Sequence, residues 1–287
     1  MRIAFLGFGL IAGSIARAVR ANESVAGWTM TAWSPSGRGP LEAVEDGTID
    51  RVAASPRDAI DGADLVVLAA PVPACLASMD EIAERGSGLS PSAVVTDVAS
   101  TKAALCTRAD ELGLRYVGGH PMAGLETAGY AAGRADLFTG RPWVIVPGIA
   151  AGPADVVRVE SLARACGAET IEMDAGTHDR AVAGISHLPL LLSAALAEAV
   201  AGEGAAGWAV ASRLSASGWR DMTRLARGDP SMGAGIAATN APALAGRLRD
   251  LRAVLDRWQA ELDAPGGPDP AAIEDRLRAA RSRLDAT

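Results

Sequence analysis

The segment 2–20 restricts the possible folds of this chain more than any other stretch. A strand pattern over Ile3–Leu6 leads into a short turn, and helical periodicity follows over Leu10–Val19. The turn has the spacing G-x-G-x-x-A, an accepted variant of the dinucleotide-binding fingerprint. Because the motif stands between a strand and a helix, it predicts the first unit of a parallel sheet that binds a dinucleotide.

Each residue of this turn has an expected task. Gly7 permits the tight turn, Gly9 leaves room for a pyrophosphate, and Ala12 lets the helix pack closely on the strand. The backbone N–H groups at the helix start, Leu10 and Ile11, are expected to face the phosphates. The alternative is a glycine-rich turn without a ligand.

Strand and helix patterns alternate through the first half of the chain. Continuous apolar runs such as "LVVLAA" suit strands that are buried on both faces of a parallel sheet. After Ile3–Leu6, the expected strands are Thr29–Trp33, Arg51–Ala54, Leu65–Ala70, Ala93–Asp97, Tyr116–Val117, Trp143–Val146 and Glu169–Met173. We therefore expect an α/β fold, with an N-terminal Rossmann-type doubly wound sheet over residues 1–173.

After Asp174 the strand patterns stop and helix formers dominate. The expected helices are His178–Val200, Ala205–Ala216, Asp221–Arg227, Ser231–Leu262 and Pro270–Leu284. Residues 174–287 are predicted to form an all-α domain that borders a substrate cleft and builds a homodimer interface. The apolar run Ala181–Ala201 includes His187 and Pro189, so a buried helix is expected rather than a membrane span.

Charge and cysteine content narrow the class of protein. A net charge of −7 argues against a nucleic-acid binder, which needs a basic face, but it allows a small anionic substrate held by a few arginines. The 3 cysteines lie far apart without a CxxC pair, so they indicate neither a metal site nor a disulfide framework. A reducing, cytoplasmic location is the expectation.

The end of the second expected strand bears on the choice of cofactor. An acidic residue usually stands there and binds the ribose 2′-hydroxyl of NAD. Ser34 occupies that position, with Ser36 and Arg38 close behind. Two hydroxyls and a guanidinium can hold a 2′-phosphate, which favours NADP over NAD; an exposed turn unrelated to specificity is the alternative. Ala70 and Pro71, at the end of a later strand, are also expected to line the cofactor.

The stretch "TDVASTK" combines Asp97, Ser100, Thr101 and Lys102 where a strand ends and a helix begins. Asp97 and Ser100 are expected to contact the cofactor, with the Ser100 hydroxyl beside the reacting groups. The alternative for Ser100 or Thr101 is a helix N-cap. Lys102 is the only lysine among the 27 basic residues, which hints that a compact ammonium is needed at this position.

The stretch "YVGGHPMAGLE" places His120, one of 3 histidines, directly before a proline. Gly118 and Gly119 predict a turn close to the ligand, and Pro121 is expected to limit movement of the ring. A histidine there can accept a proton from a hydroxyl group, as oxidation of an alcohol requires. A loop histidine bonded to local backbone is the alternative.

Polar residues in the helical half of the chain indicate a second set of residues that contact the substrate. His178 and His187 lie nine residues apart, a spacing that puts the rings on different sides of a helix, so they are not a metal pair. His187 is expected to lie near the cleft and to contact the substrate. Arg220 and Arg224 are four residues apart, on one helical face. A dicarboxylate substrate would relieve their repulsion, whereas a solvated arginine face is the alternative.

Four stretches after the N-terminal motif, taken together, resemble the prephenate/arogenate dehydrogenase family of tyrosine biosynthesis. They are "TDVASTK", "GGHPMAG", "HDRAVAGISHLP" and "DMTRLARGDPSM", and the likeness extends from Arg2 to about Asn240. The implied reaction is the NAD(P)-dependent oxidative decarboxylation of prephenate or arogenate. No part of the chain resembles a chorismate mutase or an ACT regulatory domain, so the stand-alone form is expected.

The resemblance also implies roles for single residues. His120 matches the histidine that bonds the ring hydroxyl of the substrate and helps to remove its proton. Ser100 matches a serine that orients this hydroxyl and the nicotinamide. Arg224 matches the arginine that holds a substrate carboxylate, with Glu126 and Arg220 nearby.

Two positions depart from the family pattern. Many relatives that act on prephenate have a second histidine at the position of Leu190 and a tryptophan at that of Gly233. These changes leave room for arogenate, or for an amino-substituted prephenate of a specialised pathway. The further alternatives are another two-domain β-hydroxyacid or imine dehydrogenase and, from a different class, a nucleotide-binding sensor without catalysis.

Overall fold

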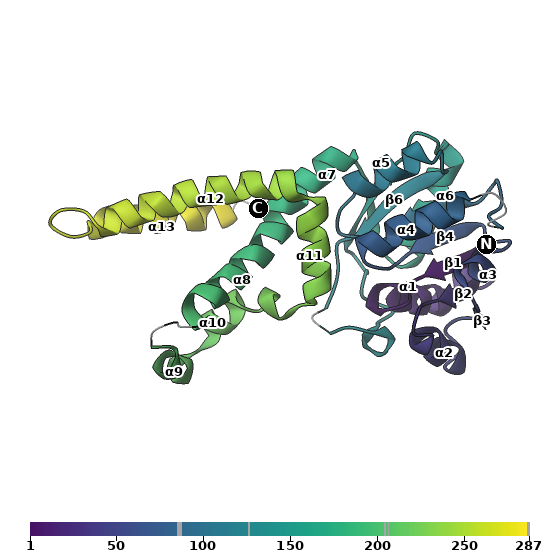
Figure 1. Cartoon of the computed structure of the whole chain (residues 1–287), viewed down its shortest axis with the longest axis horizontal. Coiled ribbons are helices and arrows are strands. Elements are labelled where there is room, and N and C mark those ends of the chain that lie inside the picture. Colours follow the sequence, from purple (N-terminus) through teal and green to yellow (C-terminus); the bar gives the residue numbers. More distant parts are fainter. Residues whose placement is uncertain (85–87, 126, 204, 206, 286–287) are drawn as a thin grey trace. The chain divides into compact units, whose positions relative to one another are not determined.

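The computed structural model describes residues 1–84, 88–125, 127–203, 205 and 207–285. Eight strands of this described part form one sheet in the order β3-β2-β1-β4-β5-β6-β7-β8. Figure 1 shows the sheet together with the helices that pack on it. The strands are β1 (Arg2–Leu6), β2 (Thr29–Trp33), β3 (Arg51–Val52), β4 (Leu65–Leu68), β5 (Val94–Asp97), β6 (Tyr116–Pro121), β7 (Pro142–Pro147) and β8 (Glu169–Glu172). Neighbouring strands run parallel except β6 and β7, which are antiparallel.

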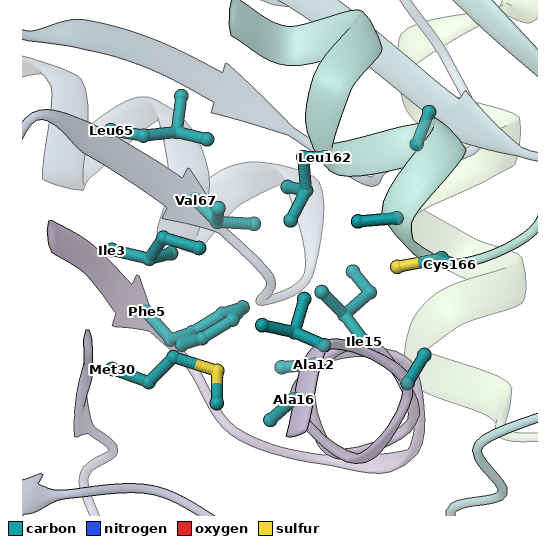
Figure 2. Packing of buried hydrophobic residues seen from close by; sticks show 14 of the residues in the cluster. Ile3, Phe5, Ala12, Ile15, Ala16, Met30, Leu65, Val67, Leu162 and Cys166 are labelled. Carbon is teal, nitrogen blue, oxygen red and sulfur yellow. The ribbon is translucent and has the colours of Figure 1, made fainter. Parts of the chain in front are cut away.

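Helices cover both faces of this sheet. They are α1 (Leu10–Ala21), α2 (Arg38–Glu45), α3 (Pro56–Ile60), α4 (Val72–Ala83), α5 (Ala103–Glu111) and α6 (Pro153–Ala165), with 3₁₀ turns η1 (Glu23–Val25) and η2 (Tyr130–Ala132). Since successive strand residues point to opposite faces, Ile3 and Phe5 pack with α1, α2 and α6, whereas Ala4 and Leu6 pack with α3, α4 and α5. Figure 2 shows the first of these clusters. The expected Rossmann-type doubly wound sheet is confirmed.

The strand β6 corrects the expectation for the two glycines before His120. Gly118 and Gly119 do not turn the chain; they continue the strand, and His120 pairs with Val144 of β7. Neither glycine has a positive φ. Gly119 is needed for a different reason, because a Cβ there would lie 2.5 Å from the backbone oxygen of Asp97. The predicted turn was therefore wrong, and the glycine lets β6 approach the end of β5.

Within the described residues, the chain after β8 forms helices only, as expected. They are α7 (Ala175–Val182), a π-helical turn η3 (Ala183–His187), α8 (Leu188–Ala201), α9 (Trp208–Ala211), η4 (Ser212–Leu214), α10 (Ser217–Met222), η5 (Leu225–Arg227), α11 (Pro230–Thr239), α12 (Ala241–Leu262) and α13 (Pro270–Leu284). The long helix expected over Ser231–Leu262 is broken at Asn240, whose φ of −125° and ψ of 25° are not helical.

The contacts of the chain define two compact units, Met1–Ala241 and Pro242–Thr287. The first unit contains the sheet, the helices α1 to α6 that cover it, and the helices α7 to α11. The second unit contains α12 and α13. Within the first unit, α7 packs against α5 and α11 packs against α4. The domain boundary expected after residue 173 stays a prediction.

The helical run Ala175–Ala201 is the segment of the described chain that is long and apolar enough to cross a membrane, judged by length and composition alone. Only 22% of its apolar window is buried, so the buried helix expected over Ala181–Ala201 is not found. In α8, Ser193 is the one buried residue. His178 and His187 are nevertheless buried residues of this run.

Candidate active site

The predicted phosphate-binding turn lies where the carboxyl ends of β1, β2 and β4 meet. Gly7 has a φ of 89°, and its N–H donates to the carbonyl oxygen of Trp33 at 2.9 Å. A Cβ on Gly7 would lie 2.5 Å from the carbonyl oxygen of Ala69 and 3.0 Å from the amide nitrogen of Ala70, so only glycine fits there. Gly9 differs, because no atom lies within 4 Å of the place where its Cβ would be.

The start of α1 is suited to an anion. Gly9 caps this helix without a side-chain hydrogen bond, so the N–H groups of the first turn remain available. Leu10 and Ile11 are half-buried at this end, and Ala12 is buried against the sheet. The packing predicted for Ala12 is present, whereas the phosphate contacts stay predictions. Pro71 follows β4 on the same edge of the sheet and caps α4.

The loop after β2 lies beside this turn because β2 is the neighbour of β1. The Ser34 hydroxyl oxygen is buried and has no hydrogen-bond partner among the described residues. The Ser36 hydroxyl accepts a hydrogen bond from the N–H of Arg38 at 3.4 Å, and the exposed Arg38 begins α2. A buried hydroxyl without a partner is costly, so Ser34 suits a ligand that supplies one.

The Asp97 carboxylate belongs to a buried polar network at the end of β5. It forms an ion pair with Lys102 and accepts a hydrogen bond from the Tyr116 hydroxyl. The N–H groups of Ala99, at 2.7 Å, and Gly119, at 3.3 Å, also donate to it. Burial, and then the charge of Asp97, raise the pKa of Tyr116 well above its usual range, so the phenol stays a donor. The carboxylate oxygens of Asp97 already interact with four donors. A contact between Asp97 and a cofactor would therefore have to involve the backbone of Asp97.

Lys102 gains a structural explanation from this network. Its side chain is fully buried, with the ammonium on Asp97. A Cβ on Gly118 would lie 3.2 Å from Cδ of Lys102, so the lysine stem runs tightly against β6. A compact ammonium on a thin stem fits this space, whereas the broad guanidinium of arginine is larger and needs more partners.

The start of α5 is capped from a distant part of the chain. The Asp179 carboxylate accepts the N–H of Lys102 at 2.8 Å and that of Ala103 at 2.9 Å. No side chain at the helix start itself provides a cap. The alternative interpretation of Ser100 or Thr101 as the N-cap is therefore wrong. Ser100 is partly exposed, and its hydroxyl makes no hydrogen bond within the described residues.

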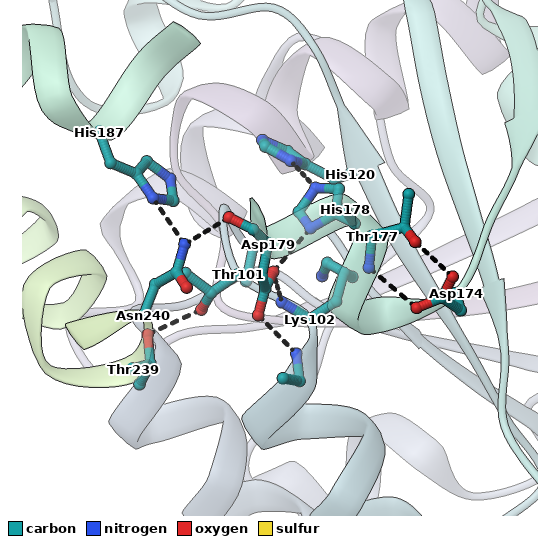
Figure 3. A network of polar contacts seen from close by, with 12 residues as sticks. Thr101, Lys102, His120, Asp174, Thr177, His178, Asp179, His187, Thr239 and Asn240 are labelled. Carbon is teal, nitrogen blue, oxygen red and sulfur yellow. Dashed lines mark hydrogen bonds and ion pairs between the residues drawn. The ribbon is translucent and has the colours of Figure 1, made fainter. Parts of the chain in front are cut away.

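His120 projects from β6 and is the first of three polar side chains in a line, followed by His178 and Asp179 (Figure 3). Its Nδ1 lies 2.8 Å from Nε2 of His178, and Nδ1 of His178 lies 2.7 Å from the Asp179 carboxylate. The two rings meet edge to face, with centroids 5.0 Å apart. His120 is 8% exposed, and its Nε2 is neither bonded to a described residue nor completely enclosed. A hydroxyl group of a substrate could therefore reach this nitrogen.

Electrostatics keeps His120 neutral and Asp179 charged. Burial lowers the pKa of His120 well below its usual value of 6.5, and Lys102, His178 and His187 lower it further. For Asp179 burial acts in the opposite direction, but hydrogen bonds from His178 and from the backbone at the start of α5 outweigh it and lower the pKa of Asp179. A neutral imidazole is the form that accepts a proton.

His187 ends the π-helical turn and is 1% exposed. The side-chain amide of Asn240 lies 3.1 Å from Nδ1 of His187 and donates to the backbone oxygen of Asp179 at 2.8 Å (Figure 3). Burial lowers the pKa of His187, and the nearby Asp179 and the backbone of Ser100 oppose this effect. Its Nε2 is enclosed without a hydrogen bond of ordinary geometry. The predicted contact of His187 with the substrate stays a prediction.

The two predicted arginines do not share a helical face. Arg220 lies in α10, but that helix ends at Met222, and Arg224 precedes the 3₁₀ turn η5. The interpretation from their spacing was wrong because the helix ends between them. Both side chains are exposed. Glu126 lies outside the described residues.

Three residues that connect to His120 or His187 were not among the predicted site residues: His178, Asp179 and Asn240. One sequence signal pointed to the first two, since a chain with 3 histidines places one of them directly before an aspartate. Nothing in the spacing shows that His178 meets His120, because 58 residues separate them.

Two family models match successive parts of the chain. The model described as prephenate dehydrogenase, nucleotide-binding domain, matches residues 15–172, and that described as prephenate dehydrogenase, dimerization domain, matches residues 174–268. The chain belongs to the prephenate dehydrogenase family. The resemblance carried by the four sequence stretches is thereby confirmed.

Individual members of the family are similar over nearly the whole chain. A prephenate dehydrogenase of Bacillus subtilis is 31% identical over 91% of this chain and 68% of its own length. The crystal structure of Synechocystis arogenate dehydrogenase is 30% identical with a TM-score of 0.80, over 99% of this chain and 100% of that chain. The structure of prephenate dehydrogenase from A. aeolicus in complex with hydroxyphenyl propionate and NAD+ shares the fold, with a TM-score of 0.88 at 22% identity, over 100% of this chain and 98% of that chain.

The nucleotide-binding domain of the family confirms the expected use of NAD or NADP. The residues of the sheet edge fit such a cofactor on three counts. Space is open in front of Gly9, the first turn of α1 offers free N–H groups, and the buried Ser34 hydroxyl lacks a partner. Gly7, Gly9 and Ser34 are the residues that would hold it.

Proposed function

We propose that this chain catalyses the NAD(P)-dependent oxidative decarboxylation of prephenate or arogenate, a step of tyrosine biosynthesis. The observation that carries the proposal is the neutral, buried His120 with an accessible Nε2. This histidine belongs to a chain whose relatives are named prephenate and arogenate dehydrogenases. A base of this kind is what oxidation of a ring hydroxyl requires.

The residues of the chain handle the proton and the carboxylates of this reaction. Bound NAD(P) supplies the acceptor for the hydride. Nε2 of His120 accepts the proton of the ring hydroxyl as hydride leaves the ring carbon that bears this hydroxyl. The ring carboxylate departs as carbon dioxide, its bonding electrons enter the ring, and the ring oxygen takes the proton back. Because aromatisation makes the reaction strongly downhill, orientation and carboxylate binding are the main tasks left to the protein.

Ser100 and Arg224 complete the proposed set of contacts. Ser100 follows β5, the neighbour of the strand that carries His120, and its unbonded hydroxyl suits the role of orienting the substrate hydroxyl. Arg224 is proposed to bind a substrate carboxylate, as its match to the family motif implies, with Arg220 nearby.

The two positions that depart from the family pattern lie together. A Cβ on Gly233 would lie 3.6 Å from Cδ2 of Leu190, so the missing histidine and the missing tryptophan affect one place. We propose that this place faces the substrate side chain. Leu190 and Gly233 offer no polar side-chain group there, which leaves arogenate or an amino-substituted prephenate as alternatives to prephenate.

An absorbance assay at 340 nm tests the function directly. The chain is incubated with prephenate and with arogenate, each combined with NAD and with NADP. We expect reduced cofactor and carbon dioxide to form in equal amounts with at least one substrate. No turnover of either substrate would refute the proposal and would favour another dehydrogenase or a nucleotide sensor.

Replacing Ser34 with Asp is expected to shift the cofactor preference toward NAD. A carboxylate at the end of β2 repels a 2′-phosphate and accepts a hydrogen bond from a free 2′-hydroxyl. We expect the ratio of kcat/KM for NADP to that for NAD to fall by about tenfold, or ~1.4 kcal/mol. Ser55→Asp, at the N-cap of α3, adds the same charge beyond β3 and should leave the ratio unchanged. An unchanged ratio in Ser34→Asp would show that specificity lies elsewhere.

Replacing Arg224 with Ala is expected to weaken substrate binding more than catalysis. Loss of a charge-assisted pair with a carboxylate should raise the substrate KM about tenfold to 100-fold. The cofactor KM should not change. Arg227→Ala removes an equal charge from the adjoining η5 turn and is the matched control. Equal effects of the two substitutions would indicate a general charge effect and not a specific contact.

We also propose a cytoplasmic homodimer built by the helical part. The matching model for residues 174–268 is described as a dimerization domain. Apolar side chains remain exposed there in the single chain, among them Ile185, Leu214 and Met222. Light scattering after gel filtration tests the dimer, for which a mass of twice 29.2 kDa is expected; a monomer at micromolar concentration would contradict it.

A further inference from the structure

The protonation of His120 follows from the groups behind it. The Asp179 carboxylate accepts three N–H donors, from Lys102 at 2.8 Å, Ala103 at 2.9 Å and the His178 ring at 2.7 Å. A carboxylate surrounded by donors remains ionised and can only accept. The Nδ1 atom of His178 must therefore carry a hydrogen.

The next bond in the line depends on this hydrogen. A neutral His178 with hydrogen on Nδ1 has a lone pair on Nε2. That lone pair lies 2.8 Å from Nδ1 of His120, so His120 must donate from Nδ1. The neutral His120 ring then has its free lone pair on Nε2. Both nitrogens of His178 are engaged, so turning this ring over would replace two hydrogen bonds with C–H contacts.

We propose that Asp179 and His178 are positioning residues that hold His120 as the Nδ1–H tautomer, with the Nε2 lone pair available to the substrate hydroxyl. The role toward substrate rests on the proposed function, whereas the protonation pattern does not. After Nε2 accepts a proton, His120 still donates from Nδ1 to His178, so the same line steadies the imidazolium. The side chains that influence the His120 ring electrostatically are Lys102, His178 and His187.

His187 provides an internal contrast. The Asn240 amide nitrogen must donate to the backbone oxygen of Asp179, so the amide group cannot be turned over. Its second hydrogen points to Nδ1 of His187, which therefore accepts. His187 is then the Nε2–H tautomer, the opposite of the form predicted for His120 and His178.

Nitrogen-15 NMR of the imidazole groups tests the pattern without any substrate. The chain has 3 histidines, so three pairs of nitrogen signals are expected at pH 7.5. His120→Asn and His187→Gln each remove one pair and assign the spectrum. We expect hydrogen on Nδ1 in His120 and His178 and on Nε2 in His187. Hydrogen on Nε2 of His120, or on both nitrogens of His178, would overturn the proposal.

Kinetics of His178 variants test whether the line acts through His120. In His178→Asn the shorter side chain cannot place an acceptor atom near Nδ1 of His120. We therefore expect kcat to fall by about 100-fold. His178→Gln places an amide oxygen near the position of the lost Nε2 and should recover part of the rate. In the His120→Asn background, His178→Asn should change kcat by less than about twofold, because both act on one group. Multiplicative losses would show a merely structural role and overturn the proposal.

The two proposals fail separately. No turnover by the unaltered chain with prephenate or arogenate would refute the function but leave the tautomers measurable. Turnover with hydrogen on Nε2 of His120 would keep the function and refute the positioning role. Asp179→Asn provides a second check, since its amide can donate to His178 and reverse the line, which moves the His120 hydrogen to Nε2.

Discussion

His120→Asn is expected to lower kcat by about 100-fold to 10,000-fold, the contribution usual for a general base. The asparagine keeps a polar side chain on β6 but has no nitrogen lone pair at the position of Nε2. Initial rates at 340 nm at saturating substrate and cofactor measure the loss. The substrate KM should change much less than kcat, because the lost interaction acts as the proton leaves.

Cofactor affinity is the control for this variant. The turn at Gly7 and Gly9 lies at β1, whereas His120 lies at the end of β6, three strands away in the sheet order. Titration calorimetry with NADP or NAD should therefore give a Kd within about twofold of that of the unaltered chain. Full turnover by the variant would assign the proton acceptor to another group.

Lys102→Met is expected to lower the free energy of unfolding by about 3–5 kcal/mol. The lysine and Asp97 are an ion pair with no exposed side-chain surface. Methionine matches the lysine stem but leaves the Asp97 charge buried and without its cation, a loss that costs this amount in other proteins. Urea unfolding followed by tryptophan fluorescence measures it.

Two companion variants separate the charge effect from general damage. Asp97→Asn added to Lys102→Met removes the uncompensated charge and should recover part of the loss. Arg134→Met breaks an exposed pair with Asp136, whose side chains are 60% and 64% exposed, and should leave stability nearly unchanged. Equal losses in the Lys102 and Arg134 variants would contradict the buried pair.

The strands and helices of the first half could be predicted because their signals are local. Buried parallel strands are short apolar runs, and the order of strand, turn and helix repeats along the chain. The strand β2 was predicted with the bounds that the structure shows, and β4 and β5 within two residues. The break at Asn240 was missed although Pro242, two residues later, is typical of the first turn of a new helix, whereas the end of α10 at Met222 has no such local signal.

The environment of His120 could not be predicted in the same way. Two glycines before a histidine and a proline indicate a turn, but pairing with β7 keeps the segment extended. That pairing depends on residues 142–147, which no local pattern connects to residues 116–121. The contacts of His120 with His178, and of Asp179 with the start of α5, likewise join segments 58 and more residues apart.

The amino-acid sequence by itself determined the family and the dinucleotide-binding fold of the first half, and it predicted His120 as the base. These features could be predicted because they depend on residue types at short spacing, for which local propensities and motifs give a direct signal. Only the tertiary structure decided that the Asp97 carboxylate binds Lys102 and Tyr116. It also decided that Arg220 and Arg224 do not share a helix. The hydrogen bonds from His120 to His178 and from His178 to Asp179 likewise appear only in the folded chain. Such contacts depend on how separate elements pack, and packing brings together residues whose distance along the chain carries no signal.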